Sequence, residues 1–575
     1  MNFDDVLQYI GEFGLYQKRV YFLLCLFCIF HGMRMVVMVF TLYQPKHRCA
    51  IPGYLNDTFD VTSLEHLMAV NSSIPSGDSC HIYQPGNYTY DADNRPINAS
   101  LEKCTRWVYD ESVFVSTVTG QLDLVCDDST KRSHAAMVFY GGFLIGTFLL
   151  GTISDYFGRK ICLYLSLTLV VIFGTGLVFT KSFIAFTVVN FFLGAAVPGM
   201  FPSAFVIGIE LVAPAKRTYT ASIIQLFFST GVVILSGLAF LIRDWHYLLV
   251  AITAPLVLFY LMWCLIPESP RWQIQKGRYE KARQTVLQAA KVNKKEVPSE
   301  ILDAVMPVDE DEESIALYDL EKNEREREKK AAEVKEKGRL IDVFKSPVLF
   351  VRTSIIFFNW FVISMTFYGL NFNIGNLVGA SMFLNFFISG LVEFPAYLLP
   401  MFTVDRFGRK AVHFGMLISS GVACLGCVFS IIFASDYPWI TITLAMIGKF
   451  GASGAFSTVY MYSSEIFPTV IRNSALGMSS SWGRVGAMFA PYVAAMGAKA
   501  EGELGRSVPL LVCGCLVICA GMLSCFLPET WGRKLPETVN DAKNFTKIVK
   551  ENSLLTKVNT DTDNSETSLA IENCC

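Results

Sequence analysis

The chain alternates between long apolar blocks and shorter polar connections. The apolar blocks are each about 20 residues long, which is the length that a helix needs to cross the hydrocarbon core of a bilayer. Backbone amides within lipid must bond inside their own segment, so we expect each block to be a helix. The pattern predicts twelve transmembrane helices, at residues 20–43, 135–153, 161–181, 183–208, 220–242, 246–266, 348–370, 376–402, 411–434, 439–463, 474–497 and 508–527.

The composition agrees with a membrane protein. Of the 575 residues, 52% are hydrophobic and only 17% are charged, whereas about a quarter of the residues in soluble proteins are charged. The net charge of −2 gives no indication of a nucleic-acid partner. Acidic residues at positions 4, 5 and 12 precede a first apolar run that is long enough to span, so we expect an uncleaved anchor.

A hydrophilic segment at 44–134 follows the first predicted helix. It holds four glycosylation sequons, at Asn56, Asn71, Asn87 and Asn98, and four cysteines, Cys49, Cys80, Cys104 and Cys126. This combination indicates an oxidising, extracellular side, against the alternative of chance sequons and free thiols in a cytosolic loop. Four cysteines permit three disulfide pairings, and the sequence does not choose among them.

A second polar segment, 273–347, separates two groups of six predicted helices. Within it, 19 of the 29 residues from Asp309 to Lys337 are charged, which is typical of a solvated helical or disordered linker. The tail at 539–575 is rich in polar residues, and we expect it to be disordered. Its final pair, Cys574 and Cys575, is either a palmitoylation site or a chance pair.

Cations are distributed unequally between the two sides of the predicted membrane domain. The side opposite the sequons carries Arg159, Lys160, Lys216, Arg217, Arg271, Arg406, Arg409, Lys410, Arg472, Arg533 and Lys534. Turns on the sequon side carry few, such as Lys181 and Arg243. Because cytoplasmic loops are enriched in Lys and Arg, both the N-terminal segment 1–19 and the tail are predicted to be cytoplasmic, in a protein of the plasma membrane.

The two groups of helices, within residues 20–272 and 348–538, repeat the same motifs in the same order. Asp-x-x-Gly-Arg-Lys occurs at 155–160 and at 405–410, and Glu followed seven residues later by Arg occurs at 210–217 and at 465–472. A Pro-Glu element ends each half, at 267–272 and at 528–533. A duplicated six-helix unit places a substrate site between the halves, near the bilayer midplane.

The repeated turns carry charges that could open and close the cytoplasmic face. Glycine lets the backbone make a tight turn, the acid is expected to face a helix N-terminus, and the cations can pair with nearby acids. We expect a gating network, with simple topological anchoring as the alternative. Its members are Asp155, Arg159, Glu210, Arg217, Asp405, Arg409, Glu465 and Arg472.

These paired motifs resemble those of the major facilitator superfamily. The large loop after the first helix, the Pro-Glu-Ser-Pro-Arg-Trp element at 267–272 and the Glu-x-Phe-Pro-Thr-x-x-Arg element at 465–472 resemble the organic cation/anion/carnitine transporter family. The resemblance extends from Gly11-Glu12-Phe13-Gly14 to Pro528-Glu529-Thr530. It implies an all-α fold of two pseudo-symmetric six-helix bundles and transport by alternating access, without enzymatic activity.

Charged residues inside the predicted helices are candidates for recognition, because such charges are costly in lipid. Glu393 looks like the eighth-helix acid of cation and carnitine carriers, and it could balance a substrate ammonium. Lys449 and Arg484 look like the carnitine branch, and Arg484 would suit a substrate carboxylate or chloride. Arg34 departs from the family pattern, and it could be a further anion contact or an internal partner of Glu393.

Aromatic and polar side chains could complete the substrate cavity. Rings attract a quaternary ammonium by cation–π interaction, worth about 0.5–2 kcal/mol each. Trp360 and Phe367 match substrate-lining positions of the cation branch, whereas any single ring could equally be packing. The other candidates are Tyr368, Gln225, Phe228 and Tyr460. His31 is expected to be a satisfied core histidine, with a proton relay as the alternative.

The sequence therefore predicts a polyspecific carrier of small organic cations or zwitterions, similar to tetraethylammonium or carnitine. An organic anion exchanger is the main alternative, and a non-transporting receptor or adhesion protein is a remote one. We expect no resident cofactor and no metal site. Co-transport of sodium or protons, the exact substrate and the oligomeric state are left open.

Overall fold

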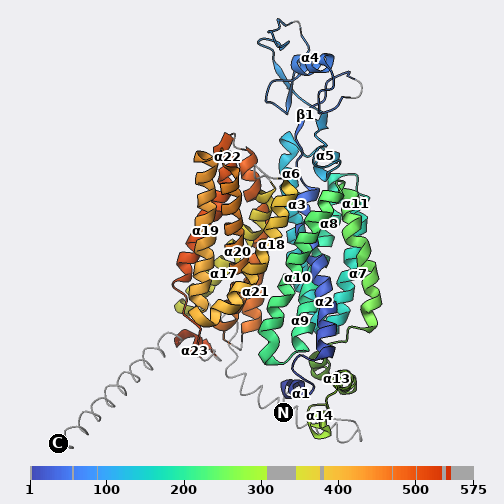
Figure 1. Ribbon diagram of the computed structural model, residues 1–575, viewed down its shortest axis with the longest axis vertical. Helices are drawn as coiled ribbons and strands as arrows, with labels where there is room; N and C mark the ends of the chain where they lie inside the picture. The colour runs from blue at the N-terminus through green and yellow to red at the C-terminus, as the bar shows by residue number, and fades with distance from the viewer. Residues whose placement is uncertain are drawn as a thin grey trace, which may run out of the picture.

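The computed structural model describes residues 3–54, 57–86, 88–306, 345–375, 381–468, 471–499, 502–533, 536 and 539–544. Two helical bundles stand side by side, and a small domain rises above one of them (Figure 1). The first bundle contains α2 (Leu15–Val36) with α3 (Met38–Thr41), α6 (Thr130–Phe157), α7 (Arg159–Val178), α8 (Phe183–Ala196) with η2 (Val197–Gly199) and α9 (Met200–Glu210), α10 (Pro214–Leu241), and α11 (Trp245–Thr253) with η3 (Ala254–Cys264). The second contains α17 (Pro347–Ile374), α18 (Met382–Phe407), α19 (Arg409–Phe433), α20 (Pro438–Ile466), α21 (Arg472–Lys499) and α22 (Gly502–Ser524).

Eleven of these segments are long and apolar enough to cross a membrane, among the residues that the structure describes. The segment that does not qualify is α21, which contains Arg484 and the serines at 479–481. Its polarity follows from its position, because α21 packs between α17 of its own half and α6 of the other half. The face of a helix that packs against other helices can carry polar residues at less cost than a face in contact with lipid.

The predicted helices are found, but several begin earlier than expected. Helix α2 starts at Leu15, five residues before the predicted span. Helix α6 starts at Thr130, within the predicted loop at 44–134. The start of the eighth predicted helix is also different, because α18 begins at Met382 and residues 376–380 lie outside the described ranges. Two helices change to 3-10 geometry at Pro198 and Pro255, since proline lacks the amide hydrogen that continues an α-helix.

Short helices cover the end of the first bundle that lies opposite the small domain. They are α1 (Phe3–Tyr9), α12 (Pro270–Gln275), α13 (Tyr279–Asn293) and α14 (Ser299–Val305), and Figure 1 places α1, α13 and α14 below that bundle. Asn293 joins them to the membrane domain, because its side chain bonds to the Tyr16 amide at 2.9 Å and to Gln17 at 2.8 Å. The first part of the predicted linker is therefore folded, and its charged stretch, 309–337, lies outside the described residues.

The segment between α3 and α6, predicted to be extracellular, forms a small domain with two antiparallel strand pairs and one longer helix. Strand β1 (His47–Cys49) pairs with β4 (Trp107–Tyr109), and β2 (His81–Tyr83) pairs with β3 (Leu101–Lys103). Helix α4 (Leu64–Ser73) completes it, together with the short α5 (Val118–Gln121) and η1 (Cys126–Ser129) near the membrane. Disulfides join Cys49 to Cys104 and Cys80 to Cys126, so the structure selects one of the three possible pairings.

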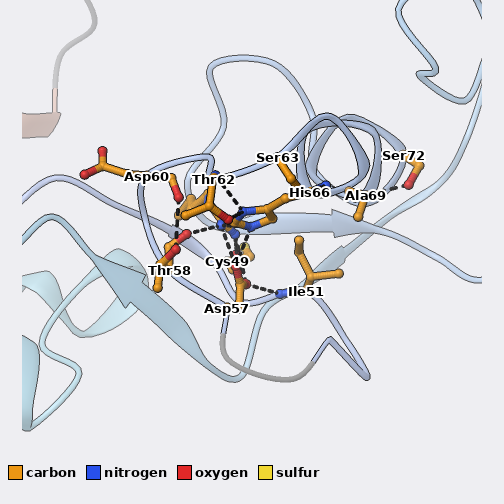
Figure 2. A network of polar contacts seen from close by, with 11 residues as sticks. Cys49, Ile51, Asp57, Thr58, Asp60, Thr62, Ser63, His66, Ala69 and Ser72 are labelled. Atoms are coloured by element: carbon orange, nitrogen blue, oxygen red, sulfur yellow. Dashed lines mark hydrogen bonds and ion pairs between the residues drawn. The ribbon is translucent and has the colours of Figure 1, made fainter.

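A buried polar cluster organises this domain (Figure 2). Asp57 pairs with Arg48 at 2.6 Å and with the His66 Nε2 at 2.9 Å, and it accepts a hydrogen bond from the Ile51 amide at 2.8 Å. Burial alone would raise the pKa of Asp57, but the hydrogen bonds from these groups outweigh it and lower the pKa. Of the four predicted glycosylation sites, Asn98 is exposed and Asn71 is half-buried, whereas residues 56 and 87 are not described.

The contacts between the two bundles lie at the midplane and on the extracellular side. At the outer end, the Tyr492 hydroxyl lies 3.0 Å from the His134 Nδ1, and Phe383 stacks with Phe40, with ring centroids 6.3 Å apart. These contacts join the bundles at the end that carries the small domain. At the other end, the ion pairs of Arg159 with Asp155 and Glu210 join residues of the first half, and those of Arg409 with Asp405 and Glu465 join residues of the second.

Candidate functional site

The two charges at the centre of the second half form an ion pair. Glu393 on α18 and Lys449 on α20 are 0% exposed, and the Lys449 Nζ lies 2.9 Å from the Glu393 Oε1. Gly451 lets α20 approach α19 closely, because an added Cβ would lie 2.6 Å from the Met416 carbonyl oxygen of α19. Lys449 lies on the opposite face of α20, which this close packing turns toward α17 and α18.

Three further groups complete the surroundings of this pair. The Lys449 Nζ donates to the Asn371 Oδ1 at 2.9 Å and lies 3.4 Å from the centroid of the Phe367 ring. The Ser229 hydroxyl, on α10 of the other half, donates to the Glu393 Oε2 at 2.8 Å. The ammonium of Lys449 is therefore held by a carboxylate, an amide oxygen and an aromatic face, and the carboxylate also bonds across the interface between the halves.

Aromatic rings continue from this pair in a column along α17 and α20. Phe367 lies 5.5 Å from Phe456, and Trp360 lies 4.4 Å from Tyr460, measured between ring centroids. The Trp360 Nε1 donates to the Ser463 hydroxyl at 3.0 Å, so its polar atom is satisfied within its own half. The predicted rings thus form one contiguous surface, which also includes Phe456, a residue that sequence analysis did not single out.

The column crosses to the other half at Tyr368. Its ring centroid lies 5.2 Å from that of Phe367 and 5.0 Å from that of Tyr140 on α6. Tyr140 in turn donates to the Met35 carbonyl oxygen at 3.4 Å. Aromatic groups from both halves therefore surround the central pair, as expected of a site at the interface between the halves.

Arg484 also reaches the other half, but it has no acidic partner among the described residues. Its guanidinium carbon lies 4.4 Å from the centroid of the Phe143 ring on α6, and its Nε makes no hydrogen bond. A glycine again fixes how the helix faces its neighbours: a Cβ at Gly486 would lie 2.1 Å from the Phe361 carbonyl oxygen, so this face of α21 packs closely against α17. Arg484 is therefore a half-buried cation facing the interface between the halves, available to a negatively charged group.

The prediction that Arg34 pairs with Glu393 is wrong in this structure. The Arg34 side chain instead donates from its Nη2 to the Thr253 hydroxyl on α11, and it approaches Gly174 on α7. It therefore lies inside the first bundle, whereas Glu393 is already occupied by Lys449. The other alternative, an anion contact at Arg34, stays a prediction, and the residue is 3% exposed.

The remaining predicted residues of the first half occupy α2 and α10. Gln225 and Phe228 are half-buried on α10, and Phe228 lies 6.1 Å from the His31 ring. His31 is buried among Phe143, Phe201 and Phe228, and its Nδ1 has no partner among the described residues. The expectation of a hydrogen-bonded core histidine is therefore only half met, because the residue is in the core but its Nδ1 is unsatisfied.

The cytoplasmic turns of both halves share one capping device. The Glu268 carboxylate accepts hydrogen bonds from the amides of Arg159 at 3.0 Å and Lys160 at 3.1 Å, at the N-terminus of α7. In the second half, Glu529 does the same for Arg409 at 2.9 Å and Lys410 at 3.1 Å, at the start of α19. A carboxylate at a helix N-terminus satisfies free amides and balances the helix dipole.

This corrects the expectation that the aspartate of each turn faces the helix N-terminus. Asp155 is 78% exposed and pairs with Arg159 at 3.0 Å, and Asp405 pairs with Arg409 at 2.9 Å in the same way. The acids of the Pro-Glu elements take the capping position instead. The sequence did indicate a shared role for these glutamates, because the Pro-Glu elements occur at the same place in both halves.

The other predicted gating residues differ between the halves. Glu465 receives the Arg409 Nε at 3.1 Å, whereas Glu210 lies 3.6 Å from the Arg159 Nε. Arg217 pairs with Asp4 of α1, and the same carboxylate pairs with Arg271. Arg472 donates to the Phe467 carbonyl oxygen at 3.3 Å. Sequence analysis did not predict that Asp4 takes part.

The chain is similar to known transporters over almost its whole length. Residues 90–541 match the family described as sugar (and other) transporter. An organic cation transporter protein of Drosophila melanogaster is 37% identical over 550 residues, which cover 95% of each chain. Human organic cation/carnitine transporter 2 is 31% identical over 558 residues, which cover 94% of this chain and 93% of that protein.

A solved structure has the same fold. The xylose transporter XylE from E. coli, in a partially occluded inward-open conformation, aligns with a TM-score of 0.58 at 16% sequence identity. The alignment covers 90% of this chain and 100% of that one. The predicted major facilitator fold is thereby confirmed. The family match and the relatives confirm the expectation of a membrane transporter that is not an enzyme. The chain belongs to the sugar (and other) transporter family of the major facilitator superfamily, beside the organic cation/carnitine transporters.

Proposed function

We propose that this chain carries small organic cations or zwitterions across the plasma membrane by alternating access, with Glu393 as the acceptor of the cationic group. One observation carries the proposal: a buried ammonium already occupies a cage made of the Glu393 carboxylate, the Asn371 amide oxygen and the Phe367 ring. A carboxylate beside an aromatic face is the chemistry that recognises organic cations. The relatives named for organic cations and carnitine support the same substrate class.

In this proposal Lys449 acts as a competitor that belongs to the protein. Glu393 has no exposed surface while Lys449 holds it, so a substrate cation must displace the lysine before it can bind. Leaving a buried carboxylate without a partner costs several kcal/mol, so the exchange of one cation for another keeps the site balanced. The Ser229 hydroxyl connects Glu393 to the first half, which would let that exchange alter the contact between the halves.

Arg484 gives the site its capacity for a zwitterion. Its guanidinium carbon lies against the Phe143 ring of the first half, and it makes no ion pair among the described residues, so it could receive a substrate carboxylate. The same observation favours the second candidate, an organic anion exchanger. Glu393 opposes that candidate, because an anion would have to enter beside a buried carboxylate.

The cytoplasmic networks fit a gating role in this cycle. The halves contact each other at the outer end, so the described state would exchange substrate with the cytoplasm. Moving one positive charge inward across 100 mV, negative inside, is favourable by about 2.3 kcal/mol. Co-transport of sodium or protons is not part of the proposal. Loss of transport in a normally expressed Asp155→Asn variant would support a role in gating, and unchanged transport would contradict it.

The test is uptake of labelled tetraethylammonium, carnitine and a dicarboxylate into cells that express the protein. We expect uptake of the first two, and a decrease of about tenfold or more in Glu393→Gln, the loss that corresponds to about 1.4 kcal/mol of binding. Ser229→Ala is a milder variant of the same contact and should reduce uptake less. Lys449→Met should lower the KM for tetraethylammonium, because the internal competitor is gone.

A double variant separates recognition from folding. Glu393→Gln alone leaves the Lys449 charge buried without its partner, so it could lower surface expression. Glu393→Gln combined with Lys449→Met removes both charges and should restore that expression. Transport of cations should remain lost in the double variant. Uptake of the dicarboxylate alone would overturn the proposal in favour of anion exchange. Absence of any flux after reconstitution would favour a receptor.

A further inference from the structure

We propose that the first bundle contains a binding site for a small inorganic anion such as chloride, at Arg34 between α2, α7 and α11. Arg34 is 3% exposed, and its Nη1 has no hydrogen-bond partner among the described residues. Its Nη2 donates to the Thr253 hydroxyl, which is neutral and is itself 2% exposed. The site therefore holds a full positive charge with one uncharged partner.

The charge itself cannot be removed by deprotonation. The guanidinium keeps its proton under physiological conditions, and a buried charge without a partner is strongly unfavourable. In the part of the chain that the structure describes, Arg34 makes no ion pair with an acid, and the central acid Glu393 is taken by Lys449. A mobile anion is the counter-charge that would balance it, and it would bind to the free Nη1.

The surroundings limit the size of the ligand. A Cβ at Gly174 would lie 2.8 Å from the Arg34 Nη2, so the guanidinium passes directly over the α7 backbone. Val170 and Leu177 on the same helix and Leu249 on α11 are buried and apolar. In this apolar environment a monatomic anion needs only the guanidinium and the hydroxyl as partners.

The second half supports this assignment by contrast. Its buried cation, Lys449, has an acid 2.9 Å away and an amide oxygen at the same distance. Among the described residues Arg34 has no equivalent acid, although charges inside a membrane domain almost always pair. The two half-bundles therefore balance their buried cations in different ways, one with a side chain and the other with a ligand from solution.

The experiment measures thermal unfolding of the purified full chain in lipid nanodiscs, in chloride and in gluconate at equal ionic strength. With about 150 mM chloride, we expect the Tm of the wild type to rise by about 2 °C or more. Arg34→Gln should abolish that rise, and it should be at least as stable as the wild type in gluconate, because the unpaired charge is gone. Arg34→Lys retains the charge and should retain part of the rise.

Two controls decide between this site and the central one. Arg484→Gln should keep the chloride effect, and Thr253→Val should weaken it. In crystals grown with bromide, the anomalous signal should appear beside the Arg34 Nη1. A chloride effect that survives Arg34→Gln, a bromide signal at Arg484 alone, or a wild type with the same Tm in both salts would overturn the proposal.

Discussion

The two halves are alike at the cytoplasmic surface and different inside the membrane. Each has a glycine with positive φ at the turn between two helices, Gly158 at 123° and Gly408 at 88°, and each turn is capped by a glutamate from the end of its own half. Inside, one half buries Lys449 against Glu393 and the other buries Arg34 beside Thr253. The repeated features hold the helices together, and the features that differ are the ones that could distinguish ligands.

The largest effect that would test this comparison comes from the paired glycines. Gly158→Ala and Gly408→Ala should each lower the free energy of unfolding by about 2–4 kcal/mol, from backbone strain of about 1–3 kcal/mol and loss of the cap, worth about 1 kcal/mol. A Cβ would lie 2.2 Å from the Glu268 Oε2 in the first case and 2.6 Å from the Glu529 Oε2 in the second. Thermal unfolding in nanodiscs measures both.

Matched controls are available in the adjacent helices. Gly151 on α6 and Gly415 on α19 have nothing within 4 Å of an added Cβ, so replacing either with alanine should leave stability unchanged or slightly higher. If only one of the two turn variants lost stability, the capping device would not be equivalent in the two halves.

A smaller effect should distinguish the acids that hold the turn arginines. Glu465 receives the Arg409 Nε at 3.1 Å and also accepts a hydrogen bond from the Thr530 hydroxyl at 2.5 Å, whereas Glu210 is 3.6 Å from the Arg159 Nε. We expect Glu465→Gln to cost about 1–2 kcal/mol and Glu210→Gln about 0.5 kcal/mol or less. Equal losses in thermal unfolding would mean that the difference in distance has no energetic consequence.

Another small effect should come from Asp4, which has no described counterpart in the second half. Its carboxylate pairs with Arg217 and Arg271, both partly exposed. Asp4→Asn should cost about 0.5–1 kcal/mol and increase protease cleavage near α1, and about 1 M salt should produce most of the same change in the wild type, because salt screens exposed charges. A variant whose cleavage is unchanged would show that α1 is held by its apolar face instead.

The features that could be predicted from the sequence are those determined by short stretches of the chain. Apolar length located the helices, and the motif repeat located the two halves, because both signals are contained in short stretches of chain. Helix α21 was predicted as well, at 474–497, although Arg484 and the serines at 479–481 lower its hydropathy below that of the other eleven spans. The extracellular cysteines were recognised, but their pairing depends on how the strands fold together.

The sequence predicted which residues belong to the central site but not how they pair. Glu393, Lys449, Phe367 and Trp360 were all expected to line it, yet the pairing of Glu393 with Lys449 depends on how α18 packs beside α20. Pairing of Arg34 with Glu393 was offered for the same reason, since a fraction of a turn about the helix axis decides whether a residue of α2 faces the other half or α11. Asn371 and Ser229 carried no distinguishing signal, because polar side chains like theirs are common in these helices.

The attachment of the extracellular domain has a consequence for how motion could be observed. Backbone hydrogen bonds join Val115 to Arg243 at 3.0 Å and Trp245 to Ser116 at 3.3 Å, so the domain is tied to the outer turn of the first half. Its link to the second half is the aromatic contact of Phe114 with Phe383, at 5.3 Å. The domain would therefore tilt as a rigid lever whenever the first half rocks, and a fluorophore at its tip would report each turnover from outside the cell.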